Sequence, residues 1–96
     1  MEKGIVEFDE SQLHEVYADA VNLQTSFYGI AMTFAVSRVG QKASANARVR
    51  ISPQLAKVLC LLLRKQLKEY ERDSGNIFIP EAIVKGSGLD PTEVYL

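Results

Sequence analysis

The sequence of 96 residues is long enough for one domain, because two separate cores in such a chain would each be too small to be stable. Its 47% apolar and 24% charged residues are proportions typical of a soluble globular protein. The 11 basic and 12 acidic side chains give a net charge of −1, which argues against a general nucleic-acid binder and against a protein held at an anionic membrane surface.

Cysteine and histidine are scarce, which limits the sites that one chain can build. Cys60 is the single cysteine, so no disulfide can form within the chain, and with the single His14 it cannot make up a structural zinc site. We expect no metal and no cofactor. The sequence starts with acidic residues where a signal peptide needs basic ones, and no apolar stretch is long enough to span a bilayer. The prediction is a cytoplasmic protein without a membrane anchor.

Residues 1–15 are expected to form a mobile or loosely attached acidic arm. Their hydrophobic periodicity is weak, and a short strand around residues 5–8 is the one element that they suggest. The acidic side chains of this arm are Glu2, Glu7, Asp9, Glu10 and Glu15.

Residues 28–37 alternate between large apolar and small or polar side chains, which predicts a strand that is buried on one face. Residues 17–23 have the same period, and residues 24–27 suit a hairpin connection. Pairing Leu23 with Tyr28 places the larger side chains of both strands on one face. That face of the second strand holds Tyr28, Ile30, Met32, Phe34 and Val36; the opposite face holds Gly29, Ala31, Thr33, Ala35 and Ser37.

A third strand is predicted at residues 45–51, after a turn at residues 40–44. The alternation directs Ala45, Ala47, Val49 and Ile51 inward, and Asn46, Arg48 and Arg50 outward. The three strands are expected to form an antiparallel meander, and residues 77–79 are a candidate for a short fourth strand that Pro80 would end.

Residues 53–74 predict a long helix with both ends marked. Ser52 is a favourable N-cap, Pro53 suits the first helical position, and Gly75 stands where a left-handed C-cap residue would be. The 22 residues of this segment would span about 33 Å.

The apolar face of this helix is wider than one sheet can cover. On a helical wheel, its apolar residues fill an arc of roughly 200°, about twice the stripe of an ordinary surface helix, and Leu61 stands apart among lysines. The additional surface predicts a homodimer or higher oligomer. The alternative is a monomer in which the C-terminal tail covers the helix. The residues predicted at the interface between chains are Leu59, Cys60, Leu63, Leu67 and Tyr70.

The sequence after the helix is less regular and is interpreted as a C-terminal tail over residues 80–96. Residues 86–88, Gly-Ser-Gly, suggest a flexible break. Residues 90–96 begin like a helix, with Asp90 as a cap followed by Pro91, but the sequence ends there. The predicted organisation is thus an arm at residues 1–15, a sheet and helix at residues 16–79, and this tail.

Three polar residues are candidates for contact with a ligand or partner. Asp19 points toward the apolar side of the predicted sheet, either as a charge that protects an edge strand or as an acceptor for backbone N–H groups at a helix end. Arg48 and Arg50 form a small basic spot that would bind phosphate or an acidic partner, or would simply be solvated. The face of Gly29, Ala31, Thr33 and Ala35 beside them is flat enough to stack on another sheet or to accept an extended peptide, or is likewise solvated.

No enzymatic activity is expected. No second carboxylate and no histidine shares the predicted face of Asp19. The Gly-Ser-Gly segment follows no apolar strand and precedes no long helix, so it does not match a phosphate-binding loop, and no serine lies in a nucleophile-elbow pattern.

Several of these motifs together resemble a family of small prokaryotic proteins that is defined as a domain of unknown function. The family pattern has Tyr-Ala-Asn-x-Val, then Ser-Pro-x-x-Ala-Lys at the start of a helix, then Tyr-Glu near its end. Residues 16–79 are similar to it, although Asp19 stands where the pattern has Asn. The resemblance implies a compact domain of strands and one helix without a known activity. The matching residues are Tyr17, Ala18 and Val21; Ser52, Pro53, Ala56 and Lys57; and Tyr70, Glu71 and Gly75.

The predicted fold is α+β: a three- to four-stranded antiparallel meander packed on one long helix, with a short C-terminal extension. The strand-then-helix order is also similar, in architecture only, to the bacterial protein-export chaperone. The expected function is a non-enzymatic, oligomeric binding or scaffold protein with chaperone-like binding of polypeptides. The alternative is a regulatory module that contacts nucleic acid or an acidic partner through Arg48 and Arg50.

Overall fold

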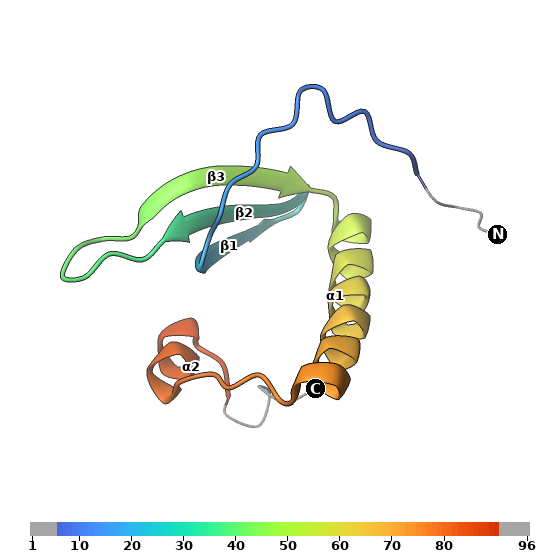
Figure 1. Cartoon of the computed structure of the whole chain (residues 1–96). Coiled ribbons are helices and arrows are strands. Elements are labelled where there is room, and N and C mark those ends of the chain that lie inside the picture. Colours follow the sequence, from blue (N-terminus) through green and yellow to red (C-terminus); the bar gives the residue numbers. More distant parts are fainter. Residues whose placement is uncertain (1–5, 91–96) are drawn as a thin grey trace. The chain divides into compact units, whose positions relative to one another are not determined.

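The structure is a computed structural model, and it describes residues 6–90 of the chain. The chain divides into two compact units, Met1–Ile51 and Ser52–Leu96. The first unit contains the strands β1 (Ala20–Ser26), β2 (Gly29–Val36) and β3 (Ser44–Ile51), and the second contains the helices α1 (Pro53–Ser74) and α2 (Glu81–Ser87) (Figure 1). This is the predicted α+β class with its antiparallel sheet and long helix.

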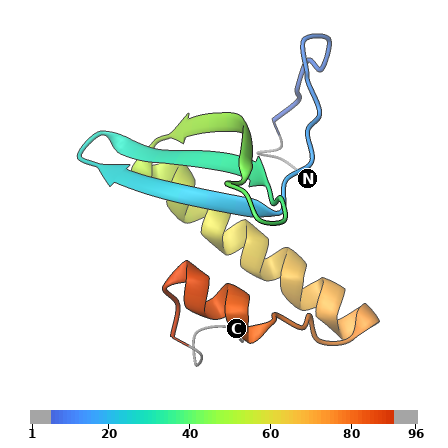
Figure 2. The ribbon, with the colours of Figure 1, turned by 90° about the vertical axis from the view of Figure 1, so that its left-hand side faces the viewer.

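The sheet is a meander in the order β1-β2-β3, with both neighbouring pairs antiparallel (Figure 2). The predicted pairing of Leu23 with Tyr28 is wrong, because Leu23 lies opposite Met32 and Val21 lies opposite Phe34. The hairpin closes at Phe27 and Tyr28 instead of at residues 24–27, so β1 extends further toward the turn than expected. Because the shift is an even number of residues, the large apolar side chains remain on one face.

A β-bulge interrupts the pairing of β2 with β3. Phe34 lies opposite Ala47 and Ala35 lies opposite Ala45, which leaves Asn46 as the extra residue. The bulge moves Ala45 to the face of Ala35, so the prediction that Ala45 shares the inward face of Ala47 is wrong. Beyond the bulge, Arg48 and Arg50 lie opposite Thr33 and Ala31, so these four residues share one face, as the alternation predicts.

α1 begins at the predicted cap. The side-chain oxygen of Ser52 accepts a hydrogen bond from the backbone N–H of Leu55 at 3.1 Å, and proline occupies the first turn. At the other end, the backbone N–H of Gly75 donates to the carbonyl of Glu71 at 2.9 Å. Gly75 has φ 87° and ψ 169°, so it ends the helix with a positive φ that favours glycine but not in the left-handed helical conformation.

Removing this cap is expected to destabilise the protein. A Ser52→Ala protein should lose about 1 kcal/mol of unfolding free energy, because the Leu55 N–H loses its acceptor. Urea denaturation at fixed protein concentration measures this loss, with Ser74→Ala at the last position of the same helix as the control. Equal stability of the two variants would contradict the assigned cap.

The remaining described segments differ from the predicted elements. Residues 77–79 and residues 6–8 have no regular secondary structure, so the described sheet has three strands and not four. The predicted break at residues 86–88 is also wrong, because Gly86 and Ser87 belong to α2 and Gly88 caps it at φ 74° and ψ 15°. The helix start predicted from Asp90 falls mainly on residues 91–96, which lie outside the described residues.

Candidate functional site

The middle of α1 exposes leucines around most of its circumference. Leu61, Leu62 and Leu63 point in directions about 100° apart, and their side chains are 58%, 54% and 51% exposed. No residue of α1 is buried. A flat partner covers an apolar stripe of little more than about 100°. No single surface can therefore cover all three leucines.

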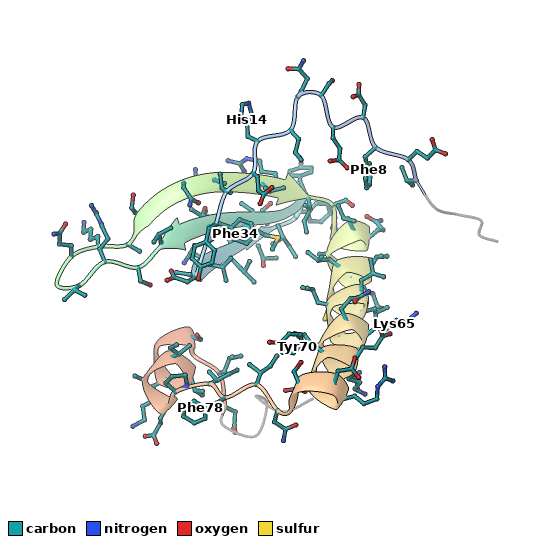
Figure 3. All side chains as sticks on the ribbon, in the orientation of Figure 1. Phe8, His14, Phe34, Lys65, Tyr70 and Phe78 are labelled. Atoms are coloured by element: carbon teal, nitrogen blue, oxygen red, sulfur yellow. The ribbon has the colours of Figure 1, made fainter. Side chains whose placement is uncertain are left out.

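We use the term α1 apolar face for the five residues that sequence analysis predicts at an interface. Each of the five lies three or four positions from another member of the set, which places all of them on one side of the continuous helix. Tyr70 projects from the apolar side of α1, and Lys65 projects from its charged side (Figure 3). Leu59 is half-buried, and the other four are exposed, namely Cys60, Leu63, Leu67 and Tyr70.

A second apolar strip lies next to this face on the N-terminal half of α1. It consists of Leu55, Val58 and Leu62, each about half exposed. The strip does not continue into the C-terminal half, because the charged Glu69 lies on the same side of the helix there. The N-terminal half of α1 thus has apolar surface for two partners, whereas the C-terminal half has it for one.

The described part of the C-terminal tail leaves the α1 apolar face open. Glu71 positions the chain after the helix, because its Oε2 accepts a hydrogen bond from the backbone N–H of Ile77 at 2.8 Å. With residues 80–90 in place, Leu63 and Tyr70 are still more than half exposed. The buried side chain in α2 is that of Val84.

The two candidate arginines lie on one face of β3, beside small residues of β2. The Nε of Arg48 donates a hydrogen bond to the hydroxyl of Thr33 at 2.9 Å, and Arg50 lies opposite Ala31. Ala31 is 8% exposed and Ala35 is 9% exposed. Ala31 lies between Gln24 and Arg50 of the neighbouring strands, and Ala35 lies between Ala20 and Ala45. Because both alanines are buried, this face is not a freely accessible flat surface.

Asp19 links the start of β1 to the end of β2 through hydrogen bonds. Its Oδ1 accepts a hydrogen bond from the backbone N–H of Ser37 at 2.8 Å, and its own N–H donates to the carbonyl of Ala35 at 3.0 Å. The carboxylate is thus an acceptor for a backbone N–H, but at a strand end and not at a helix end. Nearby, the side chain of Asn46 donates to the carbonyl of Tyr17 at 2.8 Å. The bulge in β3 therefore supports the same junction.

Sequence reasoning missed an aromatic pair at the tip of the β1–β2 hairpin. Phe27 is 92% exposed and Tyr28 is 89% exposed, and their rings meet edge to face with centroids 5.5 Å apart. The prediction assigned Tyr28 to the buried face of a strand. The signal that could have located the pair is the serine before it, since the Ser26 hydroxyl accepts the Tyr28 N–H at 3.3 Å.

The described residues contain few groups with unusual chemistry. The pKa of Asp9 lies below its usual value, mainly because the backbone N–H of Ser11 donates a hydrogen bond to its carboxylate. His14 projects from the segment before β1 and is exposed (Figure 3).

Between residues 6 and 90 there is no group of three or more His, Cys, Asp or Glu side chains that could hold a metal ion. Within the same range, no helix is long and apolar enough to cross a membrane.

Comparison with protein families places most of the chain in one of them. The model of the family described as "Protein of unknown function (DUF3467)" matches residues 2–79. The matched range includes the acidic segment, all three strands and α1, and it stops before α2. Searches of curated proteins and of solved structures found no match.

Proposed function

This chain belongs to the DUF3467 family of proteins of unknown function, and we propose that it is a non-enzymatic scaffold protein that self-associates through the α1 apolar face. Self-association would leave other apolar surface of the assembly free to bind unfolded polypeptides, as a chaperone does. The observation that carries the proposal is the exposure of leucines on three sides of α1.

The energetic gain from self-association does not depend on where the sheet lies relative to α1. One sheet face covers one side of a helix, and the leucines on the remaining sides then stay in water. Burying a fully exposed leucine stabilises a protein by roughly 1.5–3 kcal/mol, so each half-exposed leucine still offers about half of that. A second copy of the chain supplies a matching apolar surface, because a two-fold axis brings identical faces together.

The chaperone-like part of the proposal rests on the apolar surface that this interface does not use. The strip of Leu55, Val58 and Leu62 lies beside the α1 apolar face, and Phe27 and Tyr28 stand at the hairpin tip. Exposed apolar and aromatic groups bind unfolded segments of many sequences, because such contacts need no fixed pattern of hydrogen bonds.

Binding to a permanently unfolded polypeptide tests the proposal. We expect fluorescence anisotropy with a labelled, reduced and carboxymethylated polypeptide to show binding that hardly changes between about 50 mM and about 200 mM salt. Leu62→Ser should weaken the binding several-fold, whereas Lys65→Ser on the charged side should not. Absence of binding, or equal effects of the two substitutions, would contradict a chaperone-like function.

Arg48 and Arg50 support the second function, a regulatory module for nucleic acid or an acidic partner. Both side chains emerge from the same face of β3, where Thr33 holds Arg48 in place. Phosphate contacts release counterions, so such binding would fall steeply over the same range of salt. Loss of that steep dependence in an Arg48→Gln, Arg50→Gln protein would identify these arginines as the contact.

A further inference from the structure

We infer that the free edge of β1 is a second self-association surface, at which β1 of one chain pairs antiparallel with β1 of another. In the described sheet, β1 and β3 are the two edge strands. Alternate residues of β1 direct their backbone N–H and C=O groups away from β2. An open edge of this kind is a template for another strand.

The two edges differ in their protection against such pairing. β3 carries Arg48 and Arg50 and is distorted by the bulge at Asn46, and charges and bulges are the devices that keep sheet edges apart. The seven residues of β1, Ala-Val-Asn-Leu-Gln-Thr-Ser, contain no charge and no proline, and the pairing of β1 with β2 has no bulge. Val21 and Leu23 on this strand are both more than half exposed. The asymmetry favours β1 as the edge that pairs.

The sequence of β1 also selects a second copy as its partner. Opposite residues of an antiparallel pair have their side chains on the same face of the sheet. A two-fold axis perpendicular to the sheet must therefore run midway between the two copies of one residue, which keeps the apolar side chains of both strands on one face. Leu23 is the middle of β1, and an axis there gives the longest overlap. Leu23 then meets the partner's Leu23, Val21 meets the partner's Thr25, and Asn22 meets the partner's Gln24. Each face of the sheet continues across the junction without opposing like charges.

Disulfide cross-linking tests the inferred pairing. In a full-length Cys60→Ala protein, Leu23→Cys places two cysteines directly opposite each other, within the Cα separation that a disulfide requires. We expect mild oxidation to convert most of this protein to a covalent dimer on a non-reducing gel. The control is Val49→Cys, an exposed apolar position on the other edge strand, which should remain largely monomeric on the gel. Cross-linking of Leu23→Cys that is no greater than that of the control would overturn the inference.

A mixing experiment tests the register. Val21→Cys and Thr25→Cys proteins, each in the Cys60→Ala chain, should cross-link when mixed and poorly when alone. In the inferred register, the two copies of position 21 are offset by four residues along the strands, about 14 Å, and so are the two copies of position 25. Efficient cross-linking of either protein by itself would contradict the register.

The pairing of β1 is independent of the α1 apolar face, and the experiment separates the two surfaces. Leu63→Glu alters the α1 apolar face and leaves the sequence of β1 unchanged. Cross-linking of the Leu23→Cys protein that persists when Leu63→Glu is added would show β1 pairing whether or not α1 associates. Absence of cross-linking in Leu23→Cys, together with a lower solution mass in Leu63→Glu, would refute β1 pairing alone. A chain that used both surfaces would assemble beyond a dimer.

Discussion

Leu63→Glu is expected to dissociate the α1-mediated assembly and to lower the solution mass by at least half. The substitution would place a charged side chain at the centre of the α1 apolar face, once in each chain. Two half-exposed leucines contribute roughly 1.5–3 kcal/mol to a two-fold interface, and burying two glutamates there would cost more, so association should weaken more than about 10-fold. Because leucine and glutamate have similar helix propensities, and Leu63 is half exposed in the single chain, the helix itself should persist.

The matched control for this variant is Leu61→Glu. Leu61 has a similar exposed fraction but lies between Lys57 and Lys65, each one helical turn away. A glutamate there gains two favourable pairs at a spacing of four residues. We expect its mass by light scattering and its helical content by circular dichroism to match those of the wild type. A Leu63→Glu protein with the mass and melting temperature of the wild type would refute the assignment of this face.

Asp19→Ala is expected to loosen the junction between the first segment and the sheet. The substitution removes the carboxylate that accepts the Ser37 N–H at 2.8 Å. A hydrogen bond to a charged group contributes more than a neutral one, but this one is exposed, so we expect a loss of about 1 kcal/mol of unfolding free energy. Urea denaturation measures this loss, and hydrogen exchange should also become faster at the Ser37 amide.

Asp19→Asn is the informative control, because asparagine keeps a side-chain oxygen at the same place. The amide oxygen should retain most of the bond and of the stability. Equal losses in Asp19→Ala and Asp19→Asn would show that the negative charge, and not the hydrogen bond, stabilises the junction.

The sequence was informative where the signal is local or periodic. Ser52 and Pro53 predicted the start of α1, and the alternation of residues 28–37 predicted which β2 residues share a face. The register was wrong because alternation fixes only whether the pairing shift is odd or even. The turn itself is made by Phe27 and Tyr28, two aromatic residues that turn preferences do not favour.

The features that were missed depend on contacts between strands or on weak local signals. The bulge at Asn46 is held by its side chain, which reaches the carbonyl of Tyr17, far away in the sequence. α2 has recognisable marks, namely Glu81 in its first turn, an ion pair to Lys85 at 2.9 Å and Gly88 at its end. Its seven residues are too few for a clear hydrophobic period, so the glycines at its end indicated a break instead.

The candidate interface was predicted only as a set of residues on one helix face. Helical geometry places Leu59, Leu63 and Tyr70 together without any knowledge of tertiary structure. The polar junction around Asp19 could not be predicted in the same way, because it depends on where β2 ends.

The solution mass of the wild-type protein, measured by light scattering across a concentration series, tests the central claim most directly. A chain of 10.7 kDa that self-associates should show at least twice this mass at high concentration, with a decrease on dilution if the assembly is weak. A mass of one chain at every concentration would contradict self-association through α1 and through β1.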